Sequence, residues 1–319
     1  MAQIAEVSPI HEKSKALQDL YYRFLQDPSS RIVRGTAFQN IGPFIASFKD
    51  VSGIDRRITN FFVSTTEKTS NKDVCYYASF NFPAFIYVCG PKEWSIFKKL
   101  YQKLTHVNDL QTKKTLAHSI HELAKILGPE ITNSDLIPVL DKFLNDVNTE
   151  VRVGALKNLH VFLEHVAPNS RAQYIQCILT TFNQAGTDWR TKELLARNLG
   201  NYVTLFDLEI VYKEFLPMFF KFCDDRVVRV STAAATALAP ILIKFVKDPQ
   251  QQKSVIHIVK NNFFRGPKAT FKRRQLFVIM CAEVMNLSKE IFEEHFKHDM
   301  LSLASDRVPN VRIFVSRAL

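Results

Sequence analysis

A short signature, Val-Arg followed within a few residues by a small or branched side chain, returns along the whole 319-residue chain. Its clear copies begin at Val33, Val151, Val228 and Val311, and weaker copies lie between them. The second positions of the copies form the series 34, 75, 114, 152, 190, 229, 274 and 312. The resulting spacing, 38 to 45 residues, is typical of arrays in which each repeat contributes two helices.

A second pattern supports this period. Residues 137–146 and 216–225 share an apolar residue followed by proline, then Lys-Phe, then aspartate, at an offset of 79 residues, or two repeats. Proline suits the first turn of a helix, where its missing N–H costs nothing. Leu116, Ile120 and Leu123 show the helical period inside a unit. We therefore predict an all-α HEAT-repeat α-solenoid, an armadillo-like right-handed superhelix of about eight helix pairs.

The repeats predict one domain, a single HEAT-repeat array over residues 1–319. Gly90-Pro91 and Gly128-Pro129 are expected to end the second helices of the second and third repeats. Residues 53–73 include a long polar run and are predicted to form a loop within the second repeat. The last signature lies seven residues before Leu319, so we expect the native array to continue beyond this chain.

Composition narrows the cellular setting and the chemistry. The 9 glycines form neither of the two common glycine-rich phosphate loops. The five cysteines are far apart and odd in number, which favours reduced thiols inside a cell. No eighteen-residue apolar run or signal-like N-terminus occurs, so we expect a cytoplasmic or nuclear protein with no membrane segment.

Stacked repeats bring equivalent turns together in a ridge. The turn aspartates and the arginines at the helix starts are expected there, where they could pair between neighbouring repeats and hold them in register. That structural role is favoured over contact with a partner for any one of them. Trp189 stands at such a turn and could anchor an interface, although capping the core between helices explains it equally well.

No catalytic apparatus is visible, and we predict a protein that is not an enzyme and holds no cofactor or metal. His118 and His121, like His295 and His298, have the spacing of two metal ligands on one helix face. Neither pair has a third ligand at a recognised spacing, so surface or interface histidines are the favoured interpretation.

The chain carries 42 lysines and arginines against 31 acidic residues, a net charge of +11. One stretch has no acidic residue and interleaves its basic side chains with phenylalanines; its predicted basic patch comprises Lys260, Arg265, Lys268, Lys272, Arg273 and Arg274. Such a pattern could bind nucleic acid. We favour a solvated face that meets acidic protein segments.

From about Val74 onward the sequence resembles the protein phosphatase 4 regulatory subunit 1 family, which is related to the phosphatase 2A scaffold subunit. The resemblance rests on several runs, chiefly residues 115–124, 135–138 and 306–312 together with Trp189-Arg190. It implies a regulatory or scaffold subunit that binds a serine/threonine phosphatase catalytic subunit and directs it to substrates. The docking ridge of the related scaffold implies a partner-binding role for Asp146, Arg152, Trp189, Arg190, Asp225, Arg229, Asp306 and Arg312.

The alternative function is a HEAT-repeat adaptor for nuclear transport or for nucleic-acid-associated complexes, which would use the basic surface. The net charge and the basic patch motivate this alternative. Binding to nucleic acid would fall steeply as salt is raised, which separates the two functions.

Overall fold

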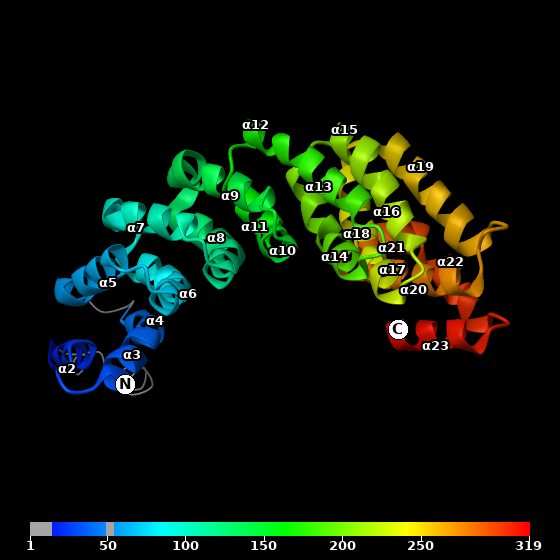
Figure 1. Ribbon diagram of the computed structural model, residues 1–319. Coiled ribbons are helices and arrows are strands. Elements are labelled where there is room, and N and C mark those ends of the chain that lie inside the picture. The colour runs from blue at the N-terminus through cyan, green and yellow to red at the C-terminus, as the bar shows by residue number, and fades with distance from the viewer. Residues whose placement is uncertain (1–14, 49–53) are drawn as a thin grey trace. The chain divides into compact units, whose positions relative to one another are not determined.

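The computed structural model describes residues 15–48 and 54–319, and all regular elements within them are helices (Figure 1). The all-α prediction is confirmed. The chain divides into two compact units, Met1–Ala167 and Pro168–Leu319. Helix pairs follow one another in both units, and the single array over 1–319 stays a prediction.

The first unit contains four helix pairs among its described residues. In each pair, helix A is followed by helix B, and some B helices are broken by a kink. The helices are α2 Lys15–Leu25, α3 Arg31–Gln39, α4 Ile41–Ala46, α5 Arg56–Lys68, α6 Lys72–Cys89, α7 Trp94–His106, α8 Leu110–Ile131, α9 Ile137–Leu144, α10 Thr149–Lys157 and α11 Leu159–Glu164.

The second unit contributes four more pairs, which agrees with the predicted number. Its helices are α12 Pro168–Arg171, α13 Gln173–Gln184, α14 Trp189–Leu205, α15 Leu208–Ile210, α16 Leu216–Cys223, α17 Val228–Ala235, α18 Leu238–Lys244, α19 Pro249–Lys260, α20 Phe271–Leu287, α21 Lys289–His295, α22 Lys297–Ser302 and α23 Pro309–Ala318. Short π-helical turns lead into α9 and α16 and follow α19.

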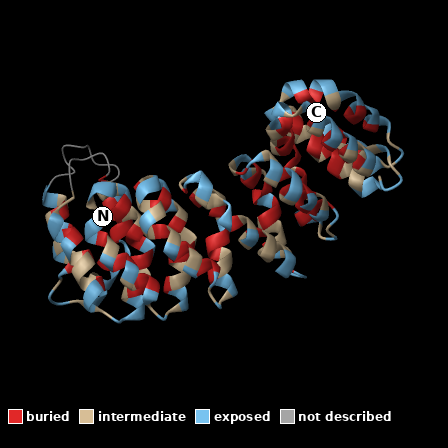
Figure 2. Ribbon diagram, turned by 90° about the horizontal axis from the view of Figure 1, so that it is seen from above, coloured by how far each residue is buried: buried red, intermediate tan, exposed pale blue. Residues whose placement is uncertain are grey.

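Buried residues, red on the ribbon of Figure 2, occur on every large helix and lie mainly on the sides that face neighbouring helices. On α8, Leu116, Ile120 and Leu123 follow the helical period and are at most 1% exposed. They belong to the core that α8 forms with α6 and α10. Burying each such side chain contributes about 1.5–3 kcal/mol, so stacking between repeats supplies the core that one helix pair lacks.

Two glycines end second helices as predicted. Gly90 has φ 75° and donates its backbone N–H to the Ile86 carbonyl at 2.9 Å, and Gly128 has φ 78° within the kink of α8. Residues that carry a side chain rarely adopt a backbone with positive φ, which is why glycine occupies both positions. In each case a proline follows and begins the next turn of chain.

The predicted polar loop at 53–73 is wrong for most of its length, because α5 occupies residues 56–68; residue 53 lies outside the described residues. Ile58 and Phe62 bury one face of α5, and Thr66 is buried with its hydroxyl donating to the Phe62 carbonyl at 2.8 Å. Lys103 of α7 donates to the carbonyls of Thr66 and Thr69 at 2.9 and 2.8 Å. The bonds from Lys103 satisfy backbone carbonyls at the C-terminal end of α5, which have no partner within the helix.

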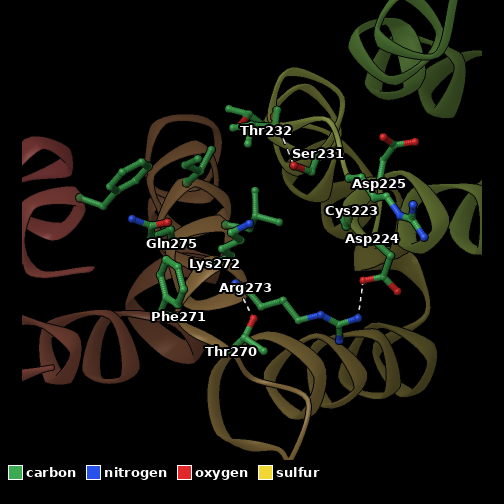
Figure 3. Close-up of a pocket in the computed structure, with 15 residues that line it drawn as sticks. Cys223, Asp224, Asp225, Ser231, Thr232, Thr270, Phe271, Lys272, Arg273 and Gln275 are labelled. Atoms are coloured by element: carbon green, nitrogen blue, oxygen red, sulfur yellow. Dashed lines mark hydrogen bonds and ion pairs between the residues drawn. The ribbon is translucent and has the colours of Figure 1, made fainter. Parts of the chain in front are cut away.

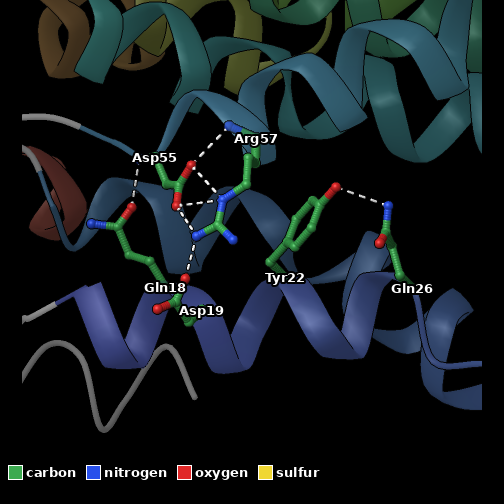
Figure 4. Close-up of polar contacts among 6 residues, drawn as sticks. All are labelled: Gln18, Asp19, Tyr22, Gln26, Asp55 and Arg57. Atoms are coloured by element: carbon green, nitrogen blue, oxygen red, sulfur yellow. Dashed lines mark hydrogen bonds and ion pairs between the residues drawn. The ribbon is translucent and has the colours of Figure 1, made fainter.

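A polar cluster joins the first helices of the first two repeats (Figure 4). Arg57 of α5 forms ion pairs with Asp19 of α2 and with Asp55, the N-cap residue of α5. Gln18 of α2 accepts a hydrogen bond from the Asp55 backbone N–H at 2.6 Å. The side-chain hydrogen bond from Arg57 lowers the pKa of Asp55, so the carboxylate that caps α5 stays ionised.

Residues 228–247 form a segment apolar and long enough to cross a membrane by composition alone. In the structure they are α17, α18 and a short 3-10 turn, and both helices pack against α14. Ala234, Leu238 and Leu242 are 0% exposed. The apolar character of this segment is explained by its place in the core of the second unit.

Candidate partner-binding surface

From the fourth repeat onward, three turns between helices A and B share one construction: residues 145–148, 224–227 and 306–308. We call them the long turns, because an aspartate stands three residues before the first residue of helix B. Each contains an aspartate whose carboxylate accepts a hydrogen bond from the backbone N–H two residues later. The distances are 2.8 Å for Asp146, 2.9 Å for Asp225 and 2.8 Å for Asp306. The aspartates therefore organise their own turns before any partner is considered.

The same aspartates also pair with the preceding repeat, through a cation at the start of its helix B. The pairs are Lys113 with Asp146 at 3.6 Å, Lys192 with Asp225 at 3.0 Å, and Arg274 with Asp306 at 2.6 Å. Arg274 bonds to both carboxylate oxygens of Asp306, since its Nη2 also donates to Oδ1 at 3.0 Å. The predicted pairing between neighbouring repeats is thus present for the aspartates.

The cations follow a second kind of turn, which we call the short turns, because the residue directly before helix B takes the place of that aspartate and caps the helix. Asp109, Asp188 and Thr270 accept hydrogen bonds from backbone N–H groups of the first helical turn. The pairing cation stands four residues after each cap. In the chain from Asp109 onward, a repeat with a short turn is followed each time by a repeat with a long turn.

Protein contacts lower the pKa of two of these aspartates. The hydrogen bonds from Arg274 are the largest influence on Asp306 and lower its pKa. For Asp225, burial alone would raise the pKa, but the Val227 N–H and Lys192 together outweigh it and the pKa falls. Both carboxylates are therefore ionised at neutral pH, as the ion pairs require.

The arginines of the signature behave differently from the expectation. Arg152 donates to the Asp146 carbonyl and Arg312 to the Asp306 carbonyl, each at 2.7 Å. These bonds close the arginine's own turn and do not reach the neighbouring repeat. The pairing predicted between repeats for these arginines is wrong, because the side chain folds back over the turn it follows.

The sixth repeat departs from this arrangement. Counting from the turn aspartate, Arg152 and Arg312 stand six residues on, and the same position after Asp225 is Ser231. Arg229 stands only four residues on, so its assignment as the equivalent arginine is wrong by two positions. The offset of 79 residues seen in the second sequence pattern gives the correct equivalence, since it places Ser231 opposite Arg152.

Arg229 takes part in a cluster with the preceding repeat instead. Its guanidinium lies over the Trp189 ring at 5.5 Å, and Arg190 lies over the same ring at 4.6 Å. Arg229 also pairs with Glu193 at 3.3 Å, and this arginine side chain is 68% exposed. Trp189 is half-buried between the two cations, so one of its edges contributes to the surface at this turn.

Four members of the predicted basic patch are bound within the protein. Lys260 and Arg265 both pair with Asp299, which is 4% exposed. Arg273 pairs with Asp224, and Arg274 pairs with Asp306. Among the described residues, Lys268 and Lys272 have no ion pair. Most of the patch therefore pairs with carboxylates from other parts of the chain, of which Asp299 is buried and Asp224 is exposed.

The histidine pairs do not gather further ligands among the described residues, where no group of three or more His, Cys, Asp or Glu side chains could hold a metal ion. Burial lowers the pKa values of His118 and His121 on α8. His118 lies against Gly154 of α10, where an added Cβ would be 3.0 Å from the imidazole ring. The pair on α8 therefore contributes to packing between the third and fourth repeats.

Sequence comparison gives this architecture a family. Residues 78–182 match the family model described as the protein phosphatase 4 regulatory subunit 1 middle domain. Serine/threonine-protein phosphatase 4 regulatory subunit 1 of Homo sapiens and that of Mus musculus are each 32% identical over 260 residues, or 79% of this chain. The chain spans 27% of the length of these relatives.

Solved structures share the fold. The karyopherin Kap121p bound to Nup53p has a TM-score of 0.60 at 14% identity, and Kap121p bound to Ste12p has 0.59 at 13%. Both comparisons cover 99% of this chain and 34% of the karyopherin. At this identity the likeness concerns the fold alone, a HEAT-repeat solenoid. The sequence relatives, at 32% identity over 79% of the chain, show that it belongs to the protein phosphatase 4 regulatory subunit 1 family.

Proposed function

We propose that this chain is the HEAT-repeat part of a regulatory subunit that binds a serine/threonine phosphatase catalytic subunit of the phosphatase 4 type and directs it to substrates. The observation that carries the proposal is the 32% identity over 260 residues to proteins named as regulatory subunits. Those names agree with a role in which catalysis belongs to the partner.

In each unit, the turns between helices A and B offer a specific surface for that partner. The long-turn aspartates are used internally, but Val147 beside Asp146 is 96% exposed and Val228, the first residue of α17, is 66% exposed. Arg190 and Arg229 are exposed around Trp189. Tryptophan and arginine are among the residues that most often dominate protein interfaces.

The test is binding of the purified catalytic subunit to the full-length protein that contains this chain. We expect Val147→Asp and Trp189→Ala to weaken binding by about tenfold each, which corresponds to about 1.4 kcal/mol. Leu287→Asp is the matched control, since Leu287 is 56% exposed and is the last residue of α20, away from the A-to-B turns. Failure of the unaltered protein to bind any phosphatase catalytic subunit would remove the proposal.

The alternative adaptor function loses part of its support, because four residues of the basic patch are bound to carboxylates of the protein itself. The likeness to Kap121p does not restore it, since that likeness shows the fold alone.

A further inference from the structure

A hollow of about 460 Å³ lies in the second unit, between the long turn after α16 and helices α17 and α20 (Figure 3). Asp224, Asp225 and Ser231 line one side of it, and Phe271 and Lys272 line the other. Phe314 of α23 also contributes. The hollow therefore opens among the second helices of three consecutive repeats.

The sixth repeat lacks the arginine that the fourth and eighth repeats have at this point. In those repeats, Arg152 and Arg312 donate to the carbonyls of their own turns. Ser231 stands at that position here; it is 6% exposed, and its short hydroxyl donates to the Val228 carbonyl at 3.2 Å. A short side chain therefore lines the hollow where the other two repeats carry a guanidinium.

The charges around the hollow are unequal. Asp225 is matched by Lys192 and Asp224 by Arg273. Two further lining cations, Arg226 and Lys272, are exposed and have no ion pair within residues 15–48 and 54–319. The lining therefore presents excess positive charge at its rim, which favours an acidic ligand.

The wall formed by α20 and α23 is apolar. Leu276 is 8% exposed, while Ile279 and Phe314 are partly exposed, and all three line the hollow. Phe271 is 41% exposed at the edge. An inserted apolar side chain would cover these groups, and burying it would contribute about 1.5–3 kcal/mol before the costs of association.

We propose that this hollow binds an extended acidic segment of a partner protein, with one apolar side chain inserted against Leu276 and Ile279 and carboxylates beside Arg226 and Lys272. The hollow borders the turn ridge at residues 224–227, but the proposal does not depend on a phosphatase partner. Net positive charge alone would attract any polyanion, whereas the apolar wall selects a segment that combines acidic and apolar side chains.

The experiment measures binding of fluorescent peptides to the chain by anisotropy. The probe has a phenylalanine flanked by glutamates; a second peptide replaces the phenylalanine with serine, a third replaces the glutamates with lysines, and a single-stranded oligonucleotide represents nucleic acid. We expect binding of the first probe and about tenfold weaker binding of the second. Absence of binding by the first probe, or equal binding by the lysine peptide or the oligonucleotide, overturns the proposal.

Variants separate a shaped site from general attraction. Ser231→Arg adds positive charge but fills the hollow, so we expect it to weaken binding of the first probe by at least about tenfold. Lys272→Ala should weaken it severalfold, while Lys253→Ala, which removes the same charge from an exposed position of α19 outside the hollow, should leave it unchanged. Tighter binding by Ser231→Arg, or equal losses from the two lysine variants, would show attraction without a site. Thermal unfolding of each variant checks that it is folded.

Discussion

The fourth and sixth repeats share their helix pattern but differ in what closes the turn between helices. In the fourth, Arg152 bonds to the Asp146 carbonyl, while Lys113 is 3.6 Å from the carboxylate. In the sixth, no arginine closes the turn, and Lys192 holds the Asp225 carboxylate at 3.0 Å. The main side-chain contact that closes the turn therefore comes from the same repeat in the fourth repeat and from the preceding repeat in the sixth.

The largest expected effect comes from removing the aspartates. Asp225→Ala should cost about 2–3 kcal/mol, because it removes the Val227 N–H acceptor and strands Lys192. Asp146→Ala should cost about 1–2 kcal/mol, since its ion pair is longer. Urea unfolding measures both losses. A double-mutant cycle should give a larger coupling energy for Lys192 with Asp225 than for Lys113 with Asp146; the reverse order would contradict the comparison.

Arg152→Ser converts the fourth turn toward the sixth. It removes bonds to the carbonyls of Asp146 and Val147 and to the Thr149 hydroxyl, so we expect a loss of about 1 kcal/mol. The unfolding midpoint in urea measures this. Arg152→Lys, which keeps the charge but not the planar fork, should recover less than half of the loss. Full recovery by lysine would mean that the charge matters and the hydrogen bonds do not.

Ser231→Arg is the reverse conversion. Ser231 is 6% exposed, but the hollow beside it gives an arginine room to reach the Asp225 carbonyl, so stability should rise by about 0.5 kcal/mol. Thr232→Arg, on the next residue of the same helix, should give no such increase. The thermal midpoint records both changes, and a marked destabilisation by Ser231→Arg would argue against the equivalence.

The smallest expected effect is a dependence of stability on pH. It arises where His118 of α8 packs against α10 of the fourth repeat. Burial lowers the pKa values of His118 and His121 in the folded chain. The unfolded chain therefore takes up protons first as pH falls below about 6.5, and stability present above that pH is lost as the solution is acidified. Unfolding measured between pH 7.5 and 5.5 should show this slope, and His118→Gln with His121→Gln should reduce it. An unchanged slope in the double variant would assign the dependence to other groups.

Much of the fold follows from the period of the sequence, since two amphipathic helices of this length must stack to cover their apolar faces. The glycine-proline pairs gave correct helix ends for a local physical reason, the backbone conformation at Gly90 and Gly128. The helix α5 was not predicted from the sequence, because Lys103, which bonds to carbonyls at the end of that helix, lies more than 30 residues further along the chain.

The candidate site was harder to predict because its contacts join residues more than 30 positions apart. The Val-Arg doublet at Val228 suggested the wrong register for the sixth repeat, whereas the aspartate spacing indicated the right one. Nothing in the sequence indicated the ion pairs of the basic patch, because the partners Asp224, Asp299 and Asp306 come from other parts of the chain. Charge composition alone does not distinguish a binding surface from an internal ion pair.

The alternation of short and long turns has a consequence for how such a chain could change in length. Each short-turn repeat from the third onward supplies a cation, and the repeat after it supplies the aspartate. Duplication or deletion of a single repeat would place two cations or two carboxylates side by side. Gain or loss of two consecutive repeats, one with a short turn and one with a long turn, would keep every charge matched. Such a pair of repeats is therefore the unit that this array could gain or lose without new changes at the contacts between repeats.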